Sequence, residues 1–253
     1  MRIDLNADVG ESFGAYTVGH DRGLMRSITS ASISAGFHAG DPSVLRETIR
    51  LAVAHGVAVG AHPGFPDLAG FGRRALTVSA REAEDFILYQ IAAVAGVAAA
   101  EGARLRHVKA HGALYTMAAA DTELAQALAR AVAAFDRSLI LFVLPRSEME
   151  RAAGRLGLHV AREAFADRAY EPDGRLMDRQ KAGSILHDAT LVVDRAVRLA
   201  TEGTVAAVDG STLRVDAGTI CVHGDTPGAD QLAARIRSGL EAAGVRVQAI
   251  GDR

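Results

Sequence analysis

The sequence predicts an α/β fold in which one domain, residues 1–253, forms a parallel (β/α) barrel of about seven strands with an irregular outline. Short β-rich runs alternate with longer runs rich in Ala and Leu, which is typical of parallel strands joined by helices. About seven or eight such units fit into 253 residues. An open nucleotide-binding sheet is disfavoured because neither GxGxxG nor a Walker A loop is present, and GFGRR at 70–74 lacks the Lys-Ser/Thr pair.

The expected strands are short apolar runs bounded by Gly, His or Asp. They fall at 2–6, 30–35, 57–61, 107–109, 139–144, 159–163, 219–222 and 246–250. The segment 205–215 contains an Asp-Gly turn between two short β-rich runs, which favours a small β-hairpin inserted into the barrel.

The expected helices lie between the strands and carry recognisable end signals. Asp41 precedes Pro42 as a cap, SARE at 79–82 is a capping box, and Gly244 follows the last helix as a stop signal. The helices are predicted at 42–55, 79–101, 120–135, 146–156, 186–202 and 227–243.

Composition excludes several functional classes. The net charge of -2 and the absence of a basic run argue against a nucleic-acid partner. Cys221 is the only cysteine and cannot form an internal disulfide, which fits a reducing cytoplasm. The acidic start MRIDLNADVGE is unlike a secretory signal, and no apolar run approaches the ~20 residues of a membrane span. We therefore expect a cytoplasmic protein with no membrane partner.

Polar residues cluster just after the predicted strands. Since all strand carboxyl ends of a parallel barrel open on one face, these clusters should converge there and form the functional site. Four of the nine histidines recur beside glycines at strand ends, which favours imidazole chemistry. The clusters contain Asn6, Asp8 and Glu11; His38 and Asp41; His62 and Asp67; Lys109 and His111; Glu163, Asp167 and Arg168; and His223 and Asp225.

Simpler roles fit some of these residues. Asp41 and Asp225 precede helices, where an N-cap role is an alternative, and Cys221 fits a small buried residue better than a nucleophile. His107 and His111 would lie about 13 Å apart if HVKAH is a strand, which is too far for one ion. Asp8, His38 and His62 are the residues that would hold a metal if one binds, although nothing local requires it.

Six motifs together resemble the LamB/YcsF family. They are LNADVGESFGAY at 5–16, ISAGFHAGDP at 33–42, GAHPGFPDLAGFGRR at 60–74, HVKAHGALY at 107–115, EAFADRAYEPDGRLMDR at 163–179 and CVHGDTPGA at 221–229. The resemblance implies a barrel related to glycoside hydrolases and polysaccharide deacetylases. It also implies the A subunit of an ATP-dependent 5-oxoprolinase, which cleaves 5-oxo-L-proline to L-glutamate together with the B and C subunits. ATP would be the co-substrate, with Mg²⁺, and the site of ATP binding stays open.

The family motifs also suggest roles for the converging residues. Asp8 or Glu163 would position or deprotonate water, Lys109 would stabilise developing negative charge, and the proton carriers would be His38, His62 and His111. Arg73 or Arg168 would hold the substrate carboxylate. The catalytic candidates are Asp8, His38, His62, Lys109, His111 and Glu163, and the substrate-binding candidates are Asn6, Arg73, Asp167, Arg168, His223 and Asp225.

The chain departs from the family pattern at five positions. Ser32, Ala35, Ala110, Thr116 and Thr226 stand where the family often has Asn, Cys, Pro, Asn and Asn. Loss of Asn side chains near strand ends would remove hydrogen bonds to a ligand. Two other functions stay open: a metal-dependent, deacetylase-like amide hydrolase, and a non-catalytic subunit that binds substrate or docks onto partners.

Overall fold

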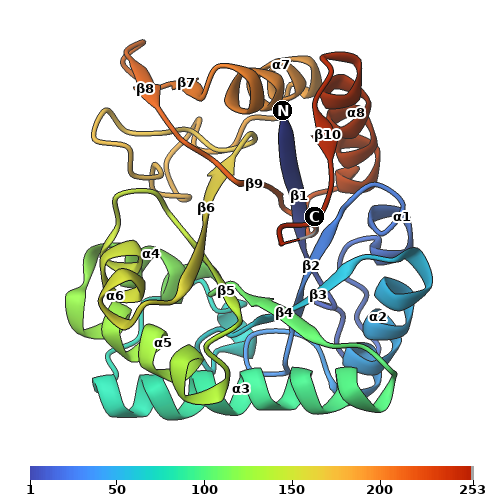
Figure 1. Ribbon diagram of the computed structural model, residues 1–253, viewed down its shortest axis with the longest axis vertical. Helices are drawn as coiled ribbons and strands as arrows, with labels where there is room; N and C mark the ends of the chain where they lie inside the picture. Colours follow the sequence, from blue (N-terminus) through green and yellow to red (C-terminus); the bar gives the residue numbers. More distant parts are fainter. Residues whose placement is uncertain (252–253) are drawn as a thin grey trace.

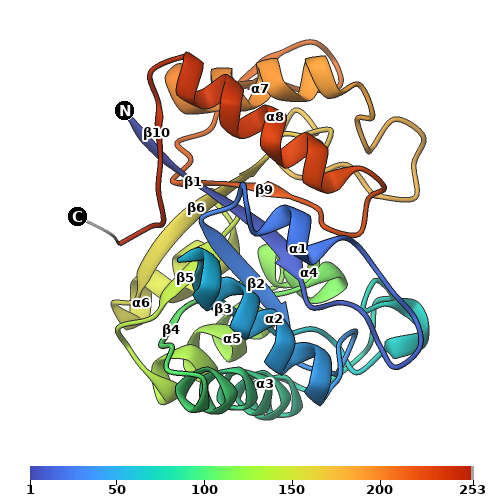
Figure 2. The ribbon, with the colours of Figure 1, turned by 90° about the vertical axis from the view of Figure 1, so that its right-hand side faces the viewer.

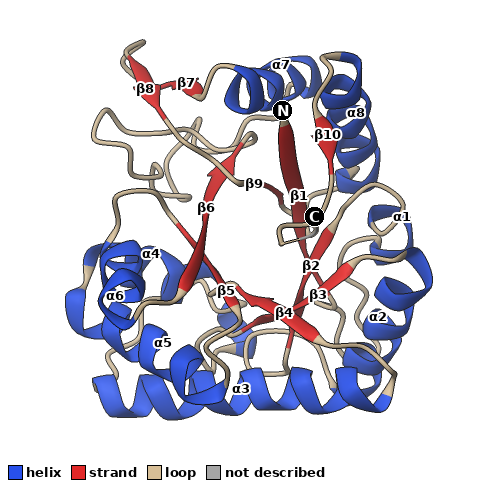
Figure 3. Cartoon of the chain, in the orientation of Figure 1, coloured by secondary structure: helices blue, strands red, loops and turns tan. Residues whose placement is uncertain are grey.

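Seven parallel strands close into a barrel in the computed structural model, which describes residues 1–251 (Figures 1 and 3). The strand order is β1-β2-β3-β4-β5-β6-β9, and β9 pairs back onto β1. The predicted seven-stranded barrel is therefore confirmed. The strands are β1 (Arg2–Val9), β2 (Ser30–Ser34), β3 (Ala58–His62), β4 (Leu105–Val108), β5 (Ile140–Val143), β6 (His159–Phe165) and β9 (Thr219–Val222).

Three short strands lie outside the closed ring. The predicted strand at 246–250 is only two residues long, β10 (Arg246–Val247), and it pairs with the first residues of β1. The predicted hairpin is present as β7 (Thr204–Ala206) and β8 (Thr212–Arg214), which pair antiparallel. Neither addition interrupts the ring.

Helices cover the outside of the barrel (Figures 1 and 2). The predicted caps are confirmed for Asp41, which accepts from the Ser43 and Val44 amides, and for Ser79, which forms a capping box with Glu82. Two helices, α1 and α4, were not predicted. The helices are α1 (Asp21–Leu24), α2 (Pro42–His55), α3 (Ala80–Ala100), α4 (Gly112–Ala120), α5 (Thr122–Phe135), α6 (Glu148–Leu156), α7 (Ala189–Thr201) and α8 (Ala229–Ala242), with a 3-10 turn η1 (Leu68–Gly70).

Helix α3 corrects one expectation about apolar runs. By length and composition alone this helix is long and apolar enough to cross a membrane, contrary to our expectation that no run approaches that length. In the barrel, one face of α3 is buried and Gln90 bonds to the backbone of Gly64 after β3. Glu84 accepts from Arg130 of α5. The buried face accounts for the apolar composition of α3. The contacts of Gln90 and Glu84 show that the helix packs on the outside of the barrel beside α5.

Strand bounds differ from the prediction where polar side chains lie inside the ladder. Strand β1 continues to Val9, so Asp8, like Asn6, belongs to the strand rather than to the following loop. Strand β6 continues past Glu163 to Phe165, and His62 is the last residue of β3 instead of the first residue after it. Polar residues inside strands weaken the apolar signal that marks a strand in sequence. Here the polar side chains lie inside the barrel near the carboxyl ends of the strands, where they form part of the site described below.

A polar network extends from the floor of the barrel toward the site. Asp4 is buried in β1 and accepts hydrogen bonds from the hydroxyls of Thr29, Ser30 and Thr219. Thr219 in turn accepts from the Asn6 amide. Burial raises the pKa of Asp4 to about 6, although the three hydroxyls partly oppose that rise. The folded protein thus holds the proton of Asp4 more tightly than an ordinary aspartate holds its proton.

This raised pKa predicts a defined pH dependence. Between about pH 4 and pH 6 the folded chain holds the Asp4 proton more tightly than the unfolded chain, so its contribution to stability falls as pH rises. The fall is about 3 kcal/mol for a pKa difference of about two units. Asp4→Asn should remove this component from urea unfolding measured across that range, whereas Asn at the exposed position Asp194 should not. Parallel profiles for wild type and Asp4→Asn would contradict the assignment.

Candidate functional site

A cavity of about 770 Å³ lies at the carboxyl ends of the strands, on the face that the sequence predicts. Its wall combines acids, bases and arginines from segments far apart in the chain. The lining residues include Asp8, His62, Arg73, Arg74, Lys109, His111, Tyr115, Thr116, Phe165, Arg168, Met177, Arg179 and His223.

Lys109 is the centre of the cavity floor. Its Nζ lies 2.7 Å from Asp8 Oδ1, 2.9 Å from Glu163 Oε1 and 3.0 Å from Asn6 Oδ1. A fourth contact, of 2.9 Å, is to the Sγ of Cys221. All five residues are buried. The two carboxylates compensate the buried ammonium, which would otherwise be costly to desolvate.

The electrostatics of this group follow from burial and charge pairing. Burial opposes the charged form of Asp8, but His62, when protonated, and Lys109 outweigh it and hold the pKa of that carboxyl well below its usual range. Burial likewise opposes the Lys109 ammonium, yet Asp8, Cys221 and Glu163 keep its pKa well above the ordinary value. Asp8 and Lys109 are therefore both charged at neutral pH, as a water-orienting carboxylate and a positive charge for a developing oxyanion require.

Three histidines and one glutamate pack beside this centre. His62 Nε2 lies 3.0 Å from His111 Nδ1 and 3.4 Å from Asp8 Oδ1. The ring of His38 stacks on His111 with a centroid separation of 3.8 Å, and Glu11 Oε1 is 3.9 Å from His111 Nδ1. Burial lowers the pKa of both His38 and His111 well below the usual value.

Glycine allows the backbone to approach these rings. Gly72 has a φ of +62°, and a Cβ there would lie 2.7 Å from the Cβ of His38 and 2.9 Å from Cδ2 of His111. A side chain would therefore strain the backbone and collide with two histidines. Gly64, in the motif AHPG, allows a similar approach, since a Cβ there would lie 2.3 Å from Nδ1 of His38.

His223 forms a second acid–base pair in the cavity wall, close to Asp8. Its Nδ1 lies 2.7 Å from Asp167 Oδ2, while Asp167 Oδ1 is buried without a hydrogen-bond partner among the described residues. His223 and Arg168 both line the cavity. Arg168 donates to the carbonyls of Ser184 and Met177, so much of its hydrogen-bonding capacity is used to hold the loop.

Arginines give the mouth of the cavity positive charge. Arg73 Nη2 lies 2.6 Å from Asp225 Oδ2, and Arg179 lies 3.8 Å from the same oxygen. Arg74 pairs with Asp67, which also caps the turn η1. Asp225 therefore orients arginines instead of capping helix α8, whose N-cap is Gly228.

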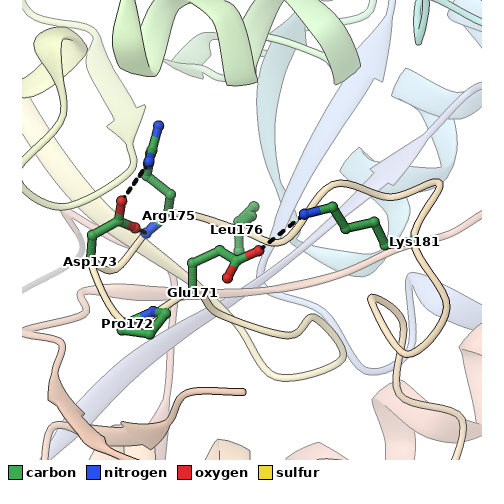
Figure 4. A pocket seen from close by; sticks show the side chains of 6 residues that line it. All are labelled: Glu171, Pro172, Asp173, Arg175, Leu176 and Lys181. Carbon is green, nitrogen blue, oxygen red and sulfur yellow. Dashed lines mark hydrogen bonds and ion pairs between the residues drawn. The ribbon is translucent and has the colours of Figure 1, made fainter. Parts of the chain in front are cut away.

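The loop between β6 and α7 closes one side of the cavity. Figure 4 shows a smaller pocket on this loop, where Asp173 bonds to Arg175 and Glu171 pairs with Lys181 at 3.7 Å. Leu176 lines both this pocket and the main cavity. The loop is thus held by its own ion pairs while it supplies part of the cavity wall.

The structure brings most predicted site residues together, with some differences in position. Asn6 and Glu163 lie beneath the cavity wall and contact Lys109, so they support the site from below. Cys221 is buried in the core as expected, and its Sγ also contacts Lys109. The conditional metal set differs too: His38 and His62 group with Glu11 and His111, whereas Asp8 groups with Cys221 and His223.

Sequence reasoning missed Tyr115 and Arg179. Tyr115 is buried against the site, and burial together with Glu163 raises the pKa of its hydroxyl well above the usual value. It lies inside the motif HGALY, on the unpredicted helix α4, so the motif itself was the available signal. Among the five departures from the family pattern, Ala110 and Thr116 line the cavity.

Comparison with known proteins gives full-length matches. Residues 3–253 match the LamB/YcsF family. The chain is 53% identical to the 5-oxoprolinase A subunit of Kocuria rhizophila over 246 residues, 97% of this chain and 98% of that protein. It is 50% identical over 252 residues to the 5-oxoprolinase A subunit of Thermococcus onnurineus, covering 100% of this chain and 99% of that one.

Solved structures agree with the sequence matches. The crystal structure of a lactam utilization protein from Thermus thermophilus is 49% identical and superposes with a TM-score of 0.94 over 99% of this chain and 100% of that one. A family 4 carbohydrate esterase from Streptomyces lividans shares the fold alone, at 11% identity and a TM-score of 0.52 over 99% and 93% of the two chains. Together with the family match, these full-length similarities show that the chain belongs to the LamB/YcsF family.

Proposed function

We propose that this chain is the A subunit of an ATP-dependent 5-oxoprolinase that converts 5-oxo-L-proline to L-glutamate with hydrolysis of ATP to ADP and phosphate. One observation carries the proposal: over its full length the chain is 50–53% identical to two proteins named as the A subunit of 5-oxoprolinase. The chemistry of the cavity supports it, because an ion-paired lysine and carboxylate lie on its floor and arginines lie at its mouth.

The proposed reaction begins with activation of the lactam. A five-membered lactam is a resonance-stabilised amide, so its carbonyl carbon is a poor electrophile. Transfer of the γ-phosphoryl group from ATP to the lactam oxygen makes that carbon reactive. One water then adds to it, the C–N bond breaks as the nitrogen takes a proton, and a second water releases phosphate.

The residues on the cavity floor suit these steps. Asp8, held ionised, is placed to orient or deprotonate the water, and Lys109 to neutralise charge on the oxygen. After taking a proton from the water, Asp8 can return it to the leaving nitrogen. His62 and His111 lie beside it, with 3.0 Å between their facing nitrogens. We assign the substrate carboxylate to Arg73 rather than Arg168, since Arg168 is bonded to backbone carbonyls.

A mixture of this chain with the B and C subunits tests the reaction type. Glutamate and phosphate should appear together, only when both 5-oxo-L-proline and ATP are present. Glutamate release without ATP, abolished by a chelator, would instead support a metal-dependent amide hydrolase. The close grouping of Glu11, His38, His62 and His111 is the observation that favours this second function.

A further inference from the structure

The facing nitrogens of His62 and His111 present a protonation problem. His62 Nδ1 lies 2.7 Å from the carbonyl oxygen of Lys109, and His111 Nε2 lies 2.8 Å from the carbonyl oxygen of Phe71. A carbonyl oxygen only accepts hydrogen bonds, so each of these nitrogens carries the proton of its ring. In the neutral rings the other nitrogens, His62 Nε2 and His111 Nδ1, therefore have lone pairs and no hydrogen.

These two lone pairs point at each other across 3.0 Å. Two acceptors at that distance repel, so a positive charge must sit between or beside them, either a proton or a metal ion. Backbone carbonyls that fix the ring tautomer and orientation are the usual outer partners of metal-bound histidines. Both rings of this pair are held in that way.

Other donors surround the same point. Glu11 Oε1 lies 3.9 Å from His111 Nδ1, and ligand atoms of Glu11, His38, His62 and His111 all lie within 4.8 Å of one another. The four side chains are buried, and His38 Nδ1 has no hydrogen-bond partner among residues 1–251. His62 and His111 also line the cavity, which gives an ion access and leaves room for a water ligand.

We propose that His62 Nε2, His111 Nδ1 and a Glu11 carboxylate oxygen bind a divalent transition-metal ion of the zinc type beside Asp8. Two imidazoles and one carboxylate form a donor set that suits such an ion and leaves a coordination position open. His38 is not assigned as a primary ligand: its ring lies parallel to that of His111, with 7° between the planes, so the two cannot both direct in-plane lone pairs at one ion. The assignment is independent of whether the chain cleaves 5-oxoproline.

Metal content and Co²⁺ spectroscopy test this site without an activity assay. The purified full-length chain, stripped with a chelator and dialysed, should take up about one Zn²⁺ per chain. Co²⁺ in place of Zn²⁺ should give the visible bands of a nitrogen-ligated, low-coordinate ion. Glu11→Gln, His62→Gln and His111→Gln should each weaken Zn²⁺ binding by about 100-fold or more, since even outer partners of metal ligands contribute about 10–100-fold.

His55→Gln is the matched control, because His55 is an exposed histidine at the end of helix α2. It should leave Zn²⁺ uptake unchanged. Circular dichroism identifies any variant that fails to fold. If a ligand variant does not fold, the Co²⁺ spectrum of the wild type alone tests whether the site binds a metal ion. The proposal would be overturned if the wild type took up no stoichiometric Zn²⁺ and showed no Co²⁺ bands, and a proton shared between the two rings would then explain their contact. It would also be overturned if the three ligand variants bound Zn²⁺ as tightly as the wild type.

Discussion

Lys109→Met should abolish glutamate release and destabilise the fold. Methionine keeps the length and apolar stem of the side chain but removes the charge that pairs with Asp8 and Glu163. Removing one partner of a buried ion pair typically costs about 3–5 kcal/mol, because the remaining charge is left without compensation. Urea unfolding at neutral pH should show this loss, and part of it should return at lower pH as the carboxylates take up protons.

Lys181→Met is the control for Lys109. Lys181 pairs with Glu171 at 3.7 Å, but its side chain is 60% exposed, so the same substitution should leave both stability and glutamate release close to wild type. If Lys109→Met were as stable and active as Lys181→Met, Lys109 would not be the centre of the site.

Asp8→Asn should lower the rate at saturating substrate by about 10²–10⁴-fold, which is the usual contribution of a positioned acid or base. Asparagine has nearly the same shape and its Oδ1 can still accept from Lys109, so the variant should fold. It lacks the negative charge that the site holds by depressing the pKa of Asp8. The measurement is the steady-state rate of glutamate release with the B and C subunits in excess.

Asp173→Asn provides the comparison for Asp8. Asp173 bonds to Arg175 on the β6–α7 loop, where its side chain is 50% exposed. Its substitution should not change the saturated rate. If Asp8→Asn weakened substrate binding but turned over at the wild-type rate once saturated, the chain would be a binding subunit rather than the catalytic one.

The barrel could be predicted because each unit carries its own local signal. Asp41 with Pro42, and the SARE capping box, mark helix starts that the structure confirms. Helix α4 escaped prediction because it follows β4 almost directly and begins at the positive-φ residue Gly112, without a side-chain cap. Strand β10 was predicted too long, since an apolar run does not distinguish a barrel strand from a two-residue edge pairing.

The site could be predicted as a set of residues but not as a set of contacts. Parallel strands bring their carboxyl ends to one face, and so Asp8, His62, Lys109 and His223 could be grouped from the sequence. Which of them touch depends on side-chain direction and on strand register. Lys109, for example, meets Cys221, 112 positions away, and no local pattern indicates that contact.

The central claim is that the Asp8–Lys109 centre of this chain opens the lactam ring. The most direct measurement is glutamate release from 5-oxo-L-proline and ATP when increasing amounts of the chain are added to fixed amounts of the B and C subunits. Release should be absent without the chain, rise with wild-type chain until the partners are saturated, and stay near background with Asp8→Asn. Equal glutamate release by the B and C subunits without this chain would contradict the claim.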